Sequence, residues 1–161
     1  MTVKIGDSIP SAVLTKVTDA GPAPVSTEDF FGGRTVALFS VPGAFTPTCS
    51  AKHLPGFVLN ADTIKQHGVD EIACLSVNDA FVMGAWGQSA HAGTAVTMLA
   101  DGSADFTTKL GLTMDATKYG MGIRGQRFSM IVKDGKVTHL NVEEPGAFAV
   151  SSAEHLMGQL A

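Results

Sequence analysis

An α/β fold, with a mixed central β-sheet flanked by helices on both faces, is the architecture that this sequence favours. Strand-like and helix-like stretches alternate along the chain, and such alternation builds a sheet with helices packed against it. A β-hairpin pattern follows near the C-terminal end, and a hairpin adds antiparallel strands. The 161 residues, with 18 glycines and 7 prolines spread over short turns, predict one domain over residues 1–161.

The first predicted strand and helix lie on either side of a loop. Residues 35–41, TVALFSV, form a short apolar run that suits a central strand covered on both faces. After the loop, Cys49 opens a stretch in which apolar residues recur at intervals of three and four, until Gly68 ends it. Pro55 lies inside this predicted helix, and we expect a kink there because proline removes one backbone hydrogen bond.

The middle of the chain continues the alternation. Residues 72–77, IACLSV, predict a second buried strand, and the Asn-Asp pair at 78–79 caps a helix that runs through Trp86. A further apolar run at 95–100 predicts a third strand, and 104–110 predicts a short helix.

The C-terminal part carries the clearest local pattern. Within residues 128–142, FSMIVK and KVTHLNV flank Asp134-Gly135, a dipeptide suited to a tight hairpin turn. Ser151 and Glu154 have the spacing of a capping box and predict a terminal helix over SAEHLMGQL.

Composition and charge exclude several functions. The net charge of −4 and the pI of about 5.6 provide no basic field for nucleic acid. No apolar run approaches the roughly 20 residues of a membrane span, and the opening MTVKIGDSIP does not resemble a secretory signal. Two cysteines are too few for a disulfide framework or a structural zinc site. We therefore expect a soluble, cytoplasmic protein in a reducing compartment.

The segment with most chemical content is PGAFTPTC, residues 42–49, between a predicted strand and a predicted helix. Ligand sites collect at such junctions in α/β sheets. In the first turn of a helix, Cys49 would meet unpaired N–H groups and the positive end of the helix dipole, which favour its thiolate. The Thr46 hydroxyl is close enough to bind the sulfur or a substrate oxygen, and Pro42 and Pro47 would stiffen the loop and shield the sulfur. From spacing alone, a small, buried and inert Cys49 is an equal alternative.

This segment resembles the P-x-x-x-T-x-x-C active-site motif of the peroxiredoxins, thiol peroxidases with a thioredoxin-like fold. The continuation KHLPGF is similar to the type II (atypical) members in particular. Four further blocks resemble type II segments in the same order: VDEIACLSVNDAFVMGAWG, LADGSADFTTKLGL, RGQRFSMIVKDGKV and VSSAEHLMGQL. The resemblance covers nearly the whole chain. It implies a thioredoxin-like α/β fold and an enzyme that reduces hydrogen peroxide and organic (alkyl) hydroperoxides.

The resemblance also assigns roles to individual residues. It makes Cys49 the nucleophile, whose thiolate attacks the O–O bond and becomes a sulfenic acid. It gives Thr46 the role of bridging sulfur and peroxide, and Pro42 that of shielding the sulfenate. In RGQRFSM the matching arginine is Arg127, whose permanent charge would stabilise the thiolate and the developing negative charge on the peroxide.

Other residues near the motif have less specific patterns. We prefer Arg127 to the nearby Arg124 as the active-site arginine because it directly precedes the predicted FSMIV strand. Without the resemblance, either arginine would be interpreted as a solvated surface charge. His53 would share a helix face with the cysteine, and a histidine that packs there without titrating is at least as good an interpretation. We expect Trp86 and Phe45 to be packing residues, with Phe45 as an alternative lining of an apolar pocket mouth.

The sequence offers no clear internal partner for an oxidised Cys49. Cys74 lies inside the predicted strand IACLSV, where rigid backbone opposes disulfide formation, although a resolving role stays open. Some type II members carry a resolving cysteine near the C-terminus, but GAFAVSSAEH has no thiol. The resemblance therefore implies an external reductant, with glutaredoxin and glutathione as the first candidate and thioredoxin as the second. It also implies a homodimer. No metal or cofactor motif is present, so electrons should arrive through thiols.

Three other activities compete with the peroxidase. A disulfide reductase would need a C-x-x-C pair, but Thr46 stands at the position of the second thiol. A cysteine hydrolase would need His53 as the base against the sulfur, and nothing else supports it. A redox sensor that oxidises at Cys49 without turnover shares the first step, and only multiple turnover separates it from the enzyme.

Overall fold

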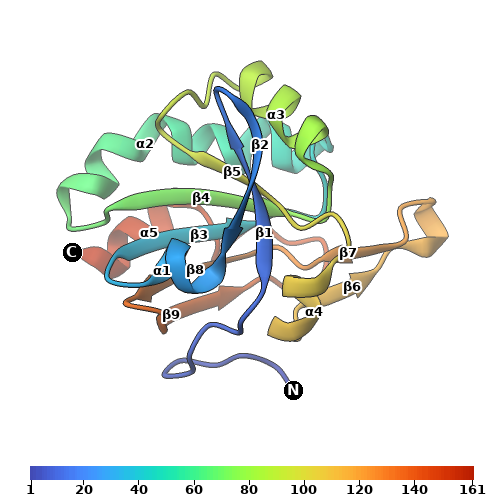
Figure 1. Cartoon of the computed structure of the whole chain (residues 1–161). Coiled ribbons are helices and arrows are strands. Elements are labelled where there is room, and N and C mark those ends of the chain that lie inside the picture. Colours follow the sequence, from blue (N-terminus) through green and yellow to red (C-terminus); the bar gives the residue numbers. More distant parts are fainter.

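A seven-stranded mixed sheet forms the centre of the molecule (Figure 1). The computed structural model describes residues 1–161. The strand order is β2-β1-β5-β4-β3-β8-β9, and β3, β4 and β5 run parallel while the outer strands pair antiparallel. The strands are β1 (Val13–Thr18), β2 (Gly21–Ser26), β3 (Thr35–Ser40), β4 (Glu71–Ser76), β5 (Thr97–Ala100), β8 (Phe128–Lys133) and β9 (Lys136–Val142). The predicted mixed sheet is confirmed.

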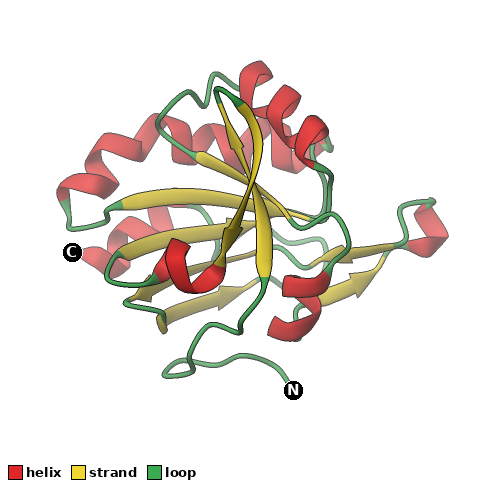
Figure 2. Cartoon of the chain, viewed as in Figure 1, coloured by secondary structure: helices red, strands yellow, loops and turns green.

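Helices cover both faces of this sheet, as predicted (Figure 2). One apolar core lies between the sheet and the helices α2 (Leu54–Gln66), α3 (Ala80–Ser89) and α5 (Ala153–Leu160). A second core lies on the opposite face, beneath α1 (Thr27–Phe31) and α4 (Asp105–Leu110). None of these helices combines the length and the apolar character that crossing a bilayer requires.

The predicted strands and the hairpin are present with small changes at their ends. Five of the six residues of β3 are buried, as expected for an apolar strand between two layers of helices. Asp134 and Gly135 both have positive φ, 48° and 75°, which suits a two-residue turn that follows the twist of the β8 and β9 strands. At the start of α3, Asp79 is the N-cap and accepts a hydrogen bond from the Val82 N–H.

The first 34 residues contain elements for which the sequence pattern gave no prediction. They form β1, β2 and α1, and a separate two-stranded ribbon, β6 (Thr113–Asp115) with β7 (Ile123–Gly125), also lies outside the predicted set. β2 reads GPAPVS, and its prolines are tolerated because it is an edge strand. Its half-buried, proline-containing pattern does not look like a strand in isolation.

The helix predicted from Cys49 onward is divided in two. Residues Cys49–His53 form a π-helical turn, in which the Leu54 N–H donates to the Cys49 carbonyl, and α2 follows. Pro55 lies in the first turn of α2, directly after the π-helical turn, where the backbone changes from the wider to the ordinary helical hydrogen-bond pattern. The irregularity that the structure shows near this proline is the wider turn directly before it.

The predicted capping box at the last helix is wrong by one residue. Ser152, not Ser151, is the N-cap of α5, and its hydroxyl accepts from the His155 N–H. Ser151 is buried, and its hydroxyl donates instead to the carboxylate of Glu143. The contact with Glu143, which directly follows β9, thus engages the side chain that local spacing assigned to the cap.

Candidate active site

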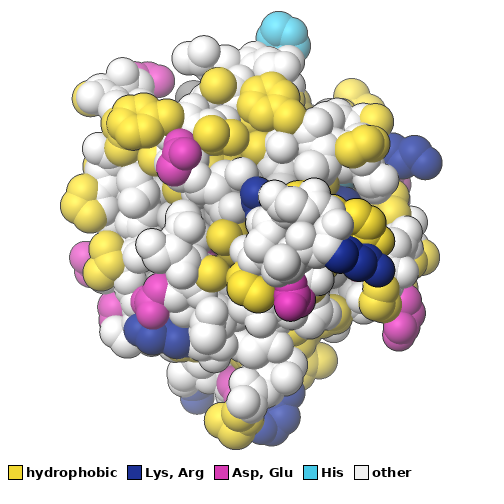
Figure 3. Space-filling view, turned by 90° about the vertical axis from the view of Figure 1, so that its right-hand side faces the viewer, with side chains coloured by type: hydrophobic (Ala, Val, Ile, Leu, Met, Phe, Trp, Pro, Cys, Tyr) yellow, Lys and Arg dark blue, Asp and Glu magenta, His cyan; other side chains and the backbone are white.

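Cys49 lies where the loop after β3 enters the π-helical turn, at the carboxyl end of the parallel strands. Figure 3 views the molecule from the side at which these strands end. The Cys49 side chain has no exposed surface, and the Ser50 N–H after it donates to the Thr46 carbonyl at 2.9 Å. This backbone bond closes the segment from Thr46 to Ser50 into one helical turn that contains Cys49.

Arg127 is the residue that contacts the sulfur. Its Nη2 donates to Cys49 Sγ at 3.1 Å. The β3–β8 register pairs Ser40 with Phe128, so Arg127 lies just beyond this pair, beside the loop that leads from β3 to the cysteine. A permanent cation at this distance stabilises a thiolate over a neutral thiol. Of the two arginines in the RGQRFSM segment, the structure brings this one to the sulfur.

Arg124 has a different set of partners. Its Nε donates to the Met121 carbonyl at 2.8 Å, and its Nη1 donates to the carbonyls of Val77 and Pro42 at 3.2 and 3.5 Å. A solvated surface charge is therefore the wrong description of Arg124. It ties the loop that carries Pro42 to two other segments, a role that sequence reasoning missed.

The loop between β3 and Cys49 is held in a tight conformation. A Cβ atom on Gly43 would lie 3.2 Å from both Arg124 Nη1 and Thr46 Cγ2, so any larger residue would have to push these side chains aside. Pro42 is half-buried in this loop. Phe45 adopts a positive φ of 64°, is 53% exposed, and has its ring centroid 6.5 Å from that of Trp86, so it packs only in part and at the surface.

The Thr46 hydroxyl is oriented by the loop rather than by the sulfur. It donates to the Gly43 carbonyl at 2.7 Å, and the hydrogen bond to Cys49 that the spacing allows is not formed in this structure. Because the hydroxyl proton is engaged, the oxygen lone pairs remain available to accept from an O–H group of a bound molecule.

His53 lies fully buried between two partners that fix its protonation state. Its Nε2 is 2.9 Å from the Ser151 carbonyl, and its Nδ1 is 2.9 Å from Arg127 Nη1. A carbonyl only accepts and a guanidinium only donates, so the ring is neutral with the proton on Nε2. Burial and, second, the Arg127 charge lower the pKa of His53 from 6.5 to about 3. Neither nitrogen binds Cys49, and the base that a cysteine hydrolase requires is therefore absent.

Glu143 is a site residue that the sequence did not single out. It follows β9, is 7% exposed, and accepts hydrogen bonds from the backbone N–H groups of Ala149, Val150 and Ser151. Desolvation raises the pKa of Glu143, but these bonds and that of the Ser151 hydroxyl together hold it below its ordinary value. In the sequence nothing separates Glu143 from its exposed neighbour Glu144.

Side chains from the neighbouring strand and helix complete the surroundings. Trp86 of α3 is 1% exposed, which confirms its packing role, and its indole N–H donates to Ser50 Oγ at 3.0 Å. The Asn78 side chain accepts from the Ala44 N–H at 3.0 Å and so attaches the loop to the end of β4.

Cys74 is a separate, fully buried thiol in β4, paired in register with Phe39 of β3. Burial, and second the charge on Cys49, raise the pKa of Cys74 well above its ordinary value. Both cysteines are free. No three side chains among His, Cys, Asp and Glu lie together in a way that could hold a metal ion.

Comparison with known proteins shows the family. The chain matches the Redoxin family over residues 4–157. It is 46% identical to Peroxiredoxin-2E-2, chloroplastic, of Oryza sativa subsp. japonica over 99% of this chain and 73% of that protein, and 44% identical to Peroxiredoxin-2B of Arabidopsis thaliana over 98% of each. The chain belongs to the type II peroxiredoxins.

Solved peroxiredoxins share the same architecture. The crystal structure of reduced Prx3 from Vibrio vulnificus in complex with hydrogen peroxide is 49% identical, with a TM-score of 0.96, over 99% of this chain and 100% of that one. Peroxiredoxin 5 from Alvinella pompejana is 32% identical with a TM-score of 0.86, over 98% and 97%. This peroxiredoxin is accordingly a thiol peroxidase with a thioredoxin-like fold.

Proposed function

We propose that this peroxiredoxin reduces hydrogen peroxide and small organic hydroperoxides through Cys49, with an external thiol as the reductant. The observation that carries the proposal is the contact of the Arg127 guanidinium with the buried Cys49 sulfur, 3.1 Å away. A thiolate stabilised in this way attacks one peroxide oxygen. An S–O bond forms and the O–O bond breaks, the second oxygen leaves with a proton as water or alcohol, and Cys49 becomes a sulfenic acid.

The surrounding loop supplies the remaining roles in this proposal. Thr46, with its hydroxyl proton donated to Gly43, accepts from the O–H of the peroxide and orients it towards the sulfur. Pro42 shields the sulfenate from water. Arg127 stabilises the negative charge that develops on the leaving oxygen. The half-exposed ring of Phe45 offers apolar surface to the alkyl group of an organic hydroperoxide.

The reductant in the proposed cycle is glutaredoxin with glutathione, and thioredoxin is the second candidate. An incoming thiol attacks the Cys49 sulfenic acid as its thiolate, hydroxide leaves and takes up the thiol's proton to become water, and a mixed disulfide forms that a second thiol reduces. Three observations support an external thiol. Cys74 lies inside a central strand, its pKa is raised, and the chain carries no other cysteine. Because Cys49 has no exposed surface, this step requires local opening of the π-helical turn.

The proposed setting is a homodimer in the cytoplasm. Hydrophobic side chains lie at the surface on the side at which β3 and β4 end (Figure 3), and Phe45 and Phe81 are 53% and 77% exposed. Burial of such rings against a second copy is favourable. Sedimentation equilibrium tests this proposal, and a monomer at all concentrations would contradict it.

The catalytic proposal is tested by peroxide consumption under multiple turnover. With a glutathione, glutaredoxin and glutathione reductase system, we expect the wild-type protein to consume many equivalents of hydrogen peroxide and Cys49→Ser to consume none. Arg127→Ala should react at least about 30-fold more slowly, since a hydrogen bond to a charged group contributes about 2 kcal/mol.

Two results would contradict the catalytic proposal. Full activity of Cys49→Ser would exclude this nucleophile, and oxidation that stops after one equivalent with every thiol system would favour a redox sensor. Replacing the glutaredoxin system by thioredoxin and its reductase ranks the two reductants. Lys136→Ala, at an exposed position remote from the cysteine loop in sequence, is the matched control for loss of a positive charge.

A further inference from the structure

Glu143 is a buried carboxylate to which the peroxidase chemistry assigns no role. Removing a carboxylate from water is costly unless hydrogen bonds replace the water. Here one oxygen, Oε2, accepts from the N–H groups of Ala149, Val150 and Ser151 and from the Ser151 hydroxyl, at 2.7 to 2.9 Å. The neighbouring Glu144 is exposed. The concentration of donors on one oxygen shows that the loop 149–151 is built around the Glu143 charge.

The loop that Glu143 holds contacts the active site through a main-chain atom. The Ser151 carbonyl accepts from His53 Nε2 at 2.9 Å. This bond places the ring proton on Nε2 and leaves the Nδ1 lone pair to accept from Arg127 Nη1, also at 2.9 Å. The other guanidinium nitrogen of Arg127, Nη2, donates to Cys49. A chain of hydrogen bonds through Ser151, His53 and Arg127 therefore links the Glu143 carboxylate to the Cys49 sulfur.

Two further contacts join the same groups. The Glu143 N–H donates to the Arg127 carbonyl at 3.0 Å, so the two residues face each other just beyond the last pair of β8 and β9. Phe148, at the start of the loop, lies 5.8 Å from the Arg127 guanidinium and 5.0 Å from the His53 ring. The arginine is thus confined by the loop from one side and by the histidine from another.

We propose that Glu143 is a positioning residue for the peroxidase reaction: by fixing the loop 149–151 it sets the His53 ring, which aims the Arg127 guanidinium at Cys49. The inference rests on the proposed role of Cys49 as nucleophile. The ionisable groups that face this network are His53 from the π-helical turn, Arg127 beside β8, and the two cysteines. Glu143 itself touches neither the sulfur nor a substrate.

The experiment compares Glu143→Gln with Glu144→Gln. A glutamine keeps the shape and one acceptor oxygen but removes the charge, so the fold should persist, as circular dichroism can verify. Two readouts are measured: the rate constant with hydrogen peroxide, by competition with horseradish peroxidase, and the pH profile of Cys49 alkylation by iodoacetamide. For Glu143→Gln we expect a rate loss of about tenfold or more, and an alkylation profile displaced to higher pH. Glu144→Gln should match the wild type in both.

A double-mutant cycle separates positioning from general destabilisation. If Glu143 acts through Arg127, adding Glu143→Gln to Arg127→Ala should cause little further loss. The same fold-loss in both backgrounds would overturn the proposal, as would a wild-type rate and alkylation profile for Glu143→Gln. Failure of the underlying function is distinguishable, because Cys49→Ser or Arg127→Ala would then retain full activity.

Discussion

The ring of His53 lies between a cation and a carbonyl oxygen, and these partners leave it a single protonation state. A second proton on Nδ1 would face the Arg127 guanidinium at 2.9 Å, in a pocket closed by Phe39 and Phe148. Folding therefore disfavours the imidazolium that forms freely in the unfolded chain. His53 therefore stays neutral and joins the Ser151 carbonyl to Arg127, and it lowers the stability of the fold only at acidic pH.

The stability of the fold should depend on pH through His53. Its folded pKa of about 3 lies below the unfolded 6.5, so between these values the unfolded chain binds more protons and stability falls as pH falls. From pH 7 to pH 5, urea titrations should show a loss of about 2 kcal/mol from this group.

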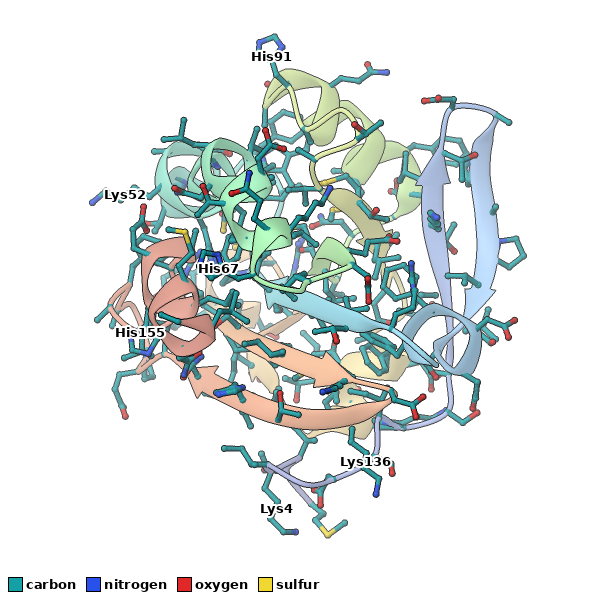
Figure 4. All side chains as sticks on the ribbon, turned by 90° about the vertical axis from the view of Figure 1, so that its left-hand side faces the viewer. Lys4, Lys52, His67, His91, Lys136 and His155 are labelled. Carbon is teal, nitrogen blue, oxygen red and sulfur yellow. The ribbon has the colours of Figure 1, made fainter.

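A histidine at the surface provides the control for this pH dependence. His155 is exposed on α5 (Figure 4), and His155→Gln should keep the wild-type slope of stability against pH. His53→Gln should be less stable at pH 7 but should lose much of the slope between pH 7 and pH 5. A slope unchanged in His53→Gln would show that another group titrates.

Among the secondary-structure elements, sequence patterns identified those whose burial is uniform. β3 and β4 are apolar throughout because both faces are covered, and the hairpin carries its own turn residues. β2 was not predicted, because its prolines fit only an edge strand. The N-cap of α5 was assigned to the wrong serine, because Ser151 binds Glu143. These failures share a cause: the place of the segment in the folded molecule decides, at the sheet edge for β2 and beside Glu143 for Ser151.

In the candidate active site, too, residues within a local motif could be predicted, and residues that act through contacts in the folded molecule could not. Cys49, Thr46 and Arg127 could be named from a short motif, because the resemblance supplies their roles and they need only their order in the chain. Glu143 and Arg124 could not be named, since their contacts are with backbone N–H groups and carbonyls of other segments. Side chains that bind main-chain atoms leave no pattern in the residues they bind.

The N-cap of α3 gives a quantitative test at the level of an element. Asp79 accepts from the Val82 N–H at 2.9 Å, at the end of the helix that carries Trp86. Asp79→Ala should reduce the free energy of unfolding by about 1 kcal/mol. Asp62→Ala, at an exposed position of α2, should change it by less than about 0.5 kcal/mol. Equal effects of the two substitutions in chemical denaturation would contradict the capping role.

At the scale of the whole molecule, the sheet limits how far the Cys74 thiol can move. Cys74 pairs with Phe39 on one side and Met98 on the other, so it lies between two parallel neighbours of β4. This pairing on both sides holds the Cys74 backbone rigidly, which opposes the movement that a disulfide with Cys49 could require. The architecture therefore favours oxidation of Cys49 to a sulfenic acid without a disulfide to Cys74.

Mass spectrometry after one equivalent of hydrogen peroxide tests this separation. We expect the protein to gain the mass of one oxygen atom, as a sulfenic acid does, and Cys74→Ser to keep most of its glutaredoxin-supported turnover. Cys74→Ala serves as a second variant should the buried hydroxyl impair folding. Loss of two hydrogens, the signature of an internal disulfide, would overturn the expectation.

The contact between Trp86 and Ser50 gives this protein an intrinsic optical probe. Trp86 is the only tryptophan in the chain, and its indole N–H is bonded to the residue directly after Cys49. An opening of the π-helical turn that moves Ser50 away from α3 would break that bond and change the surroundings of the indole. The emission of unlabelled protein can therefore report, in real time, whether the segment around the sulfur is closed or open.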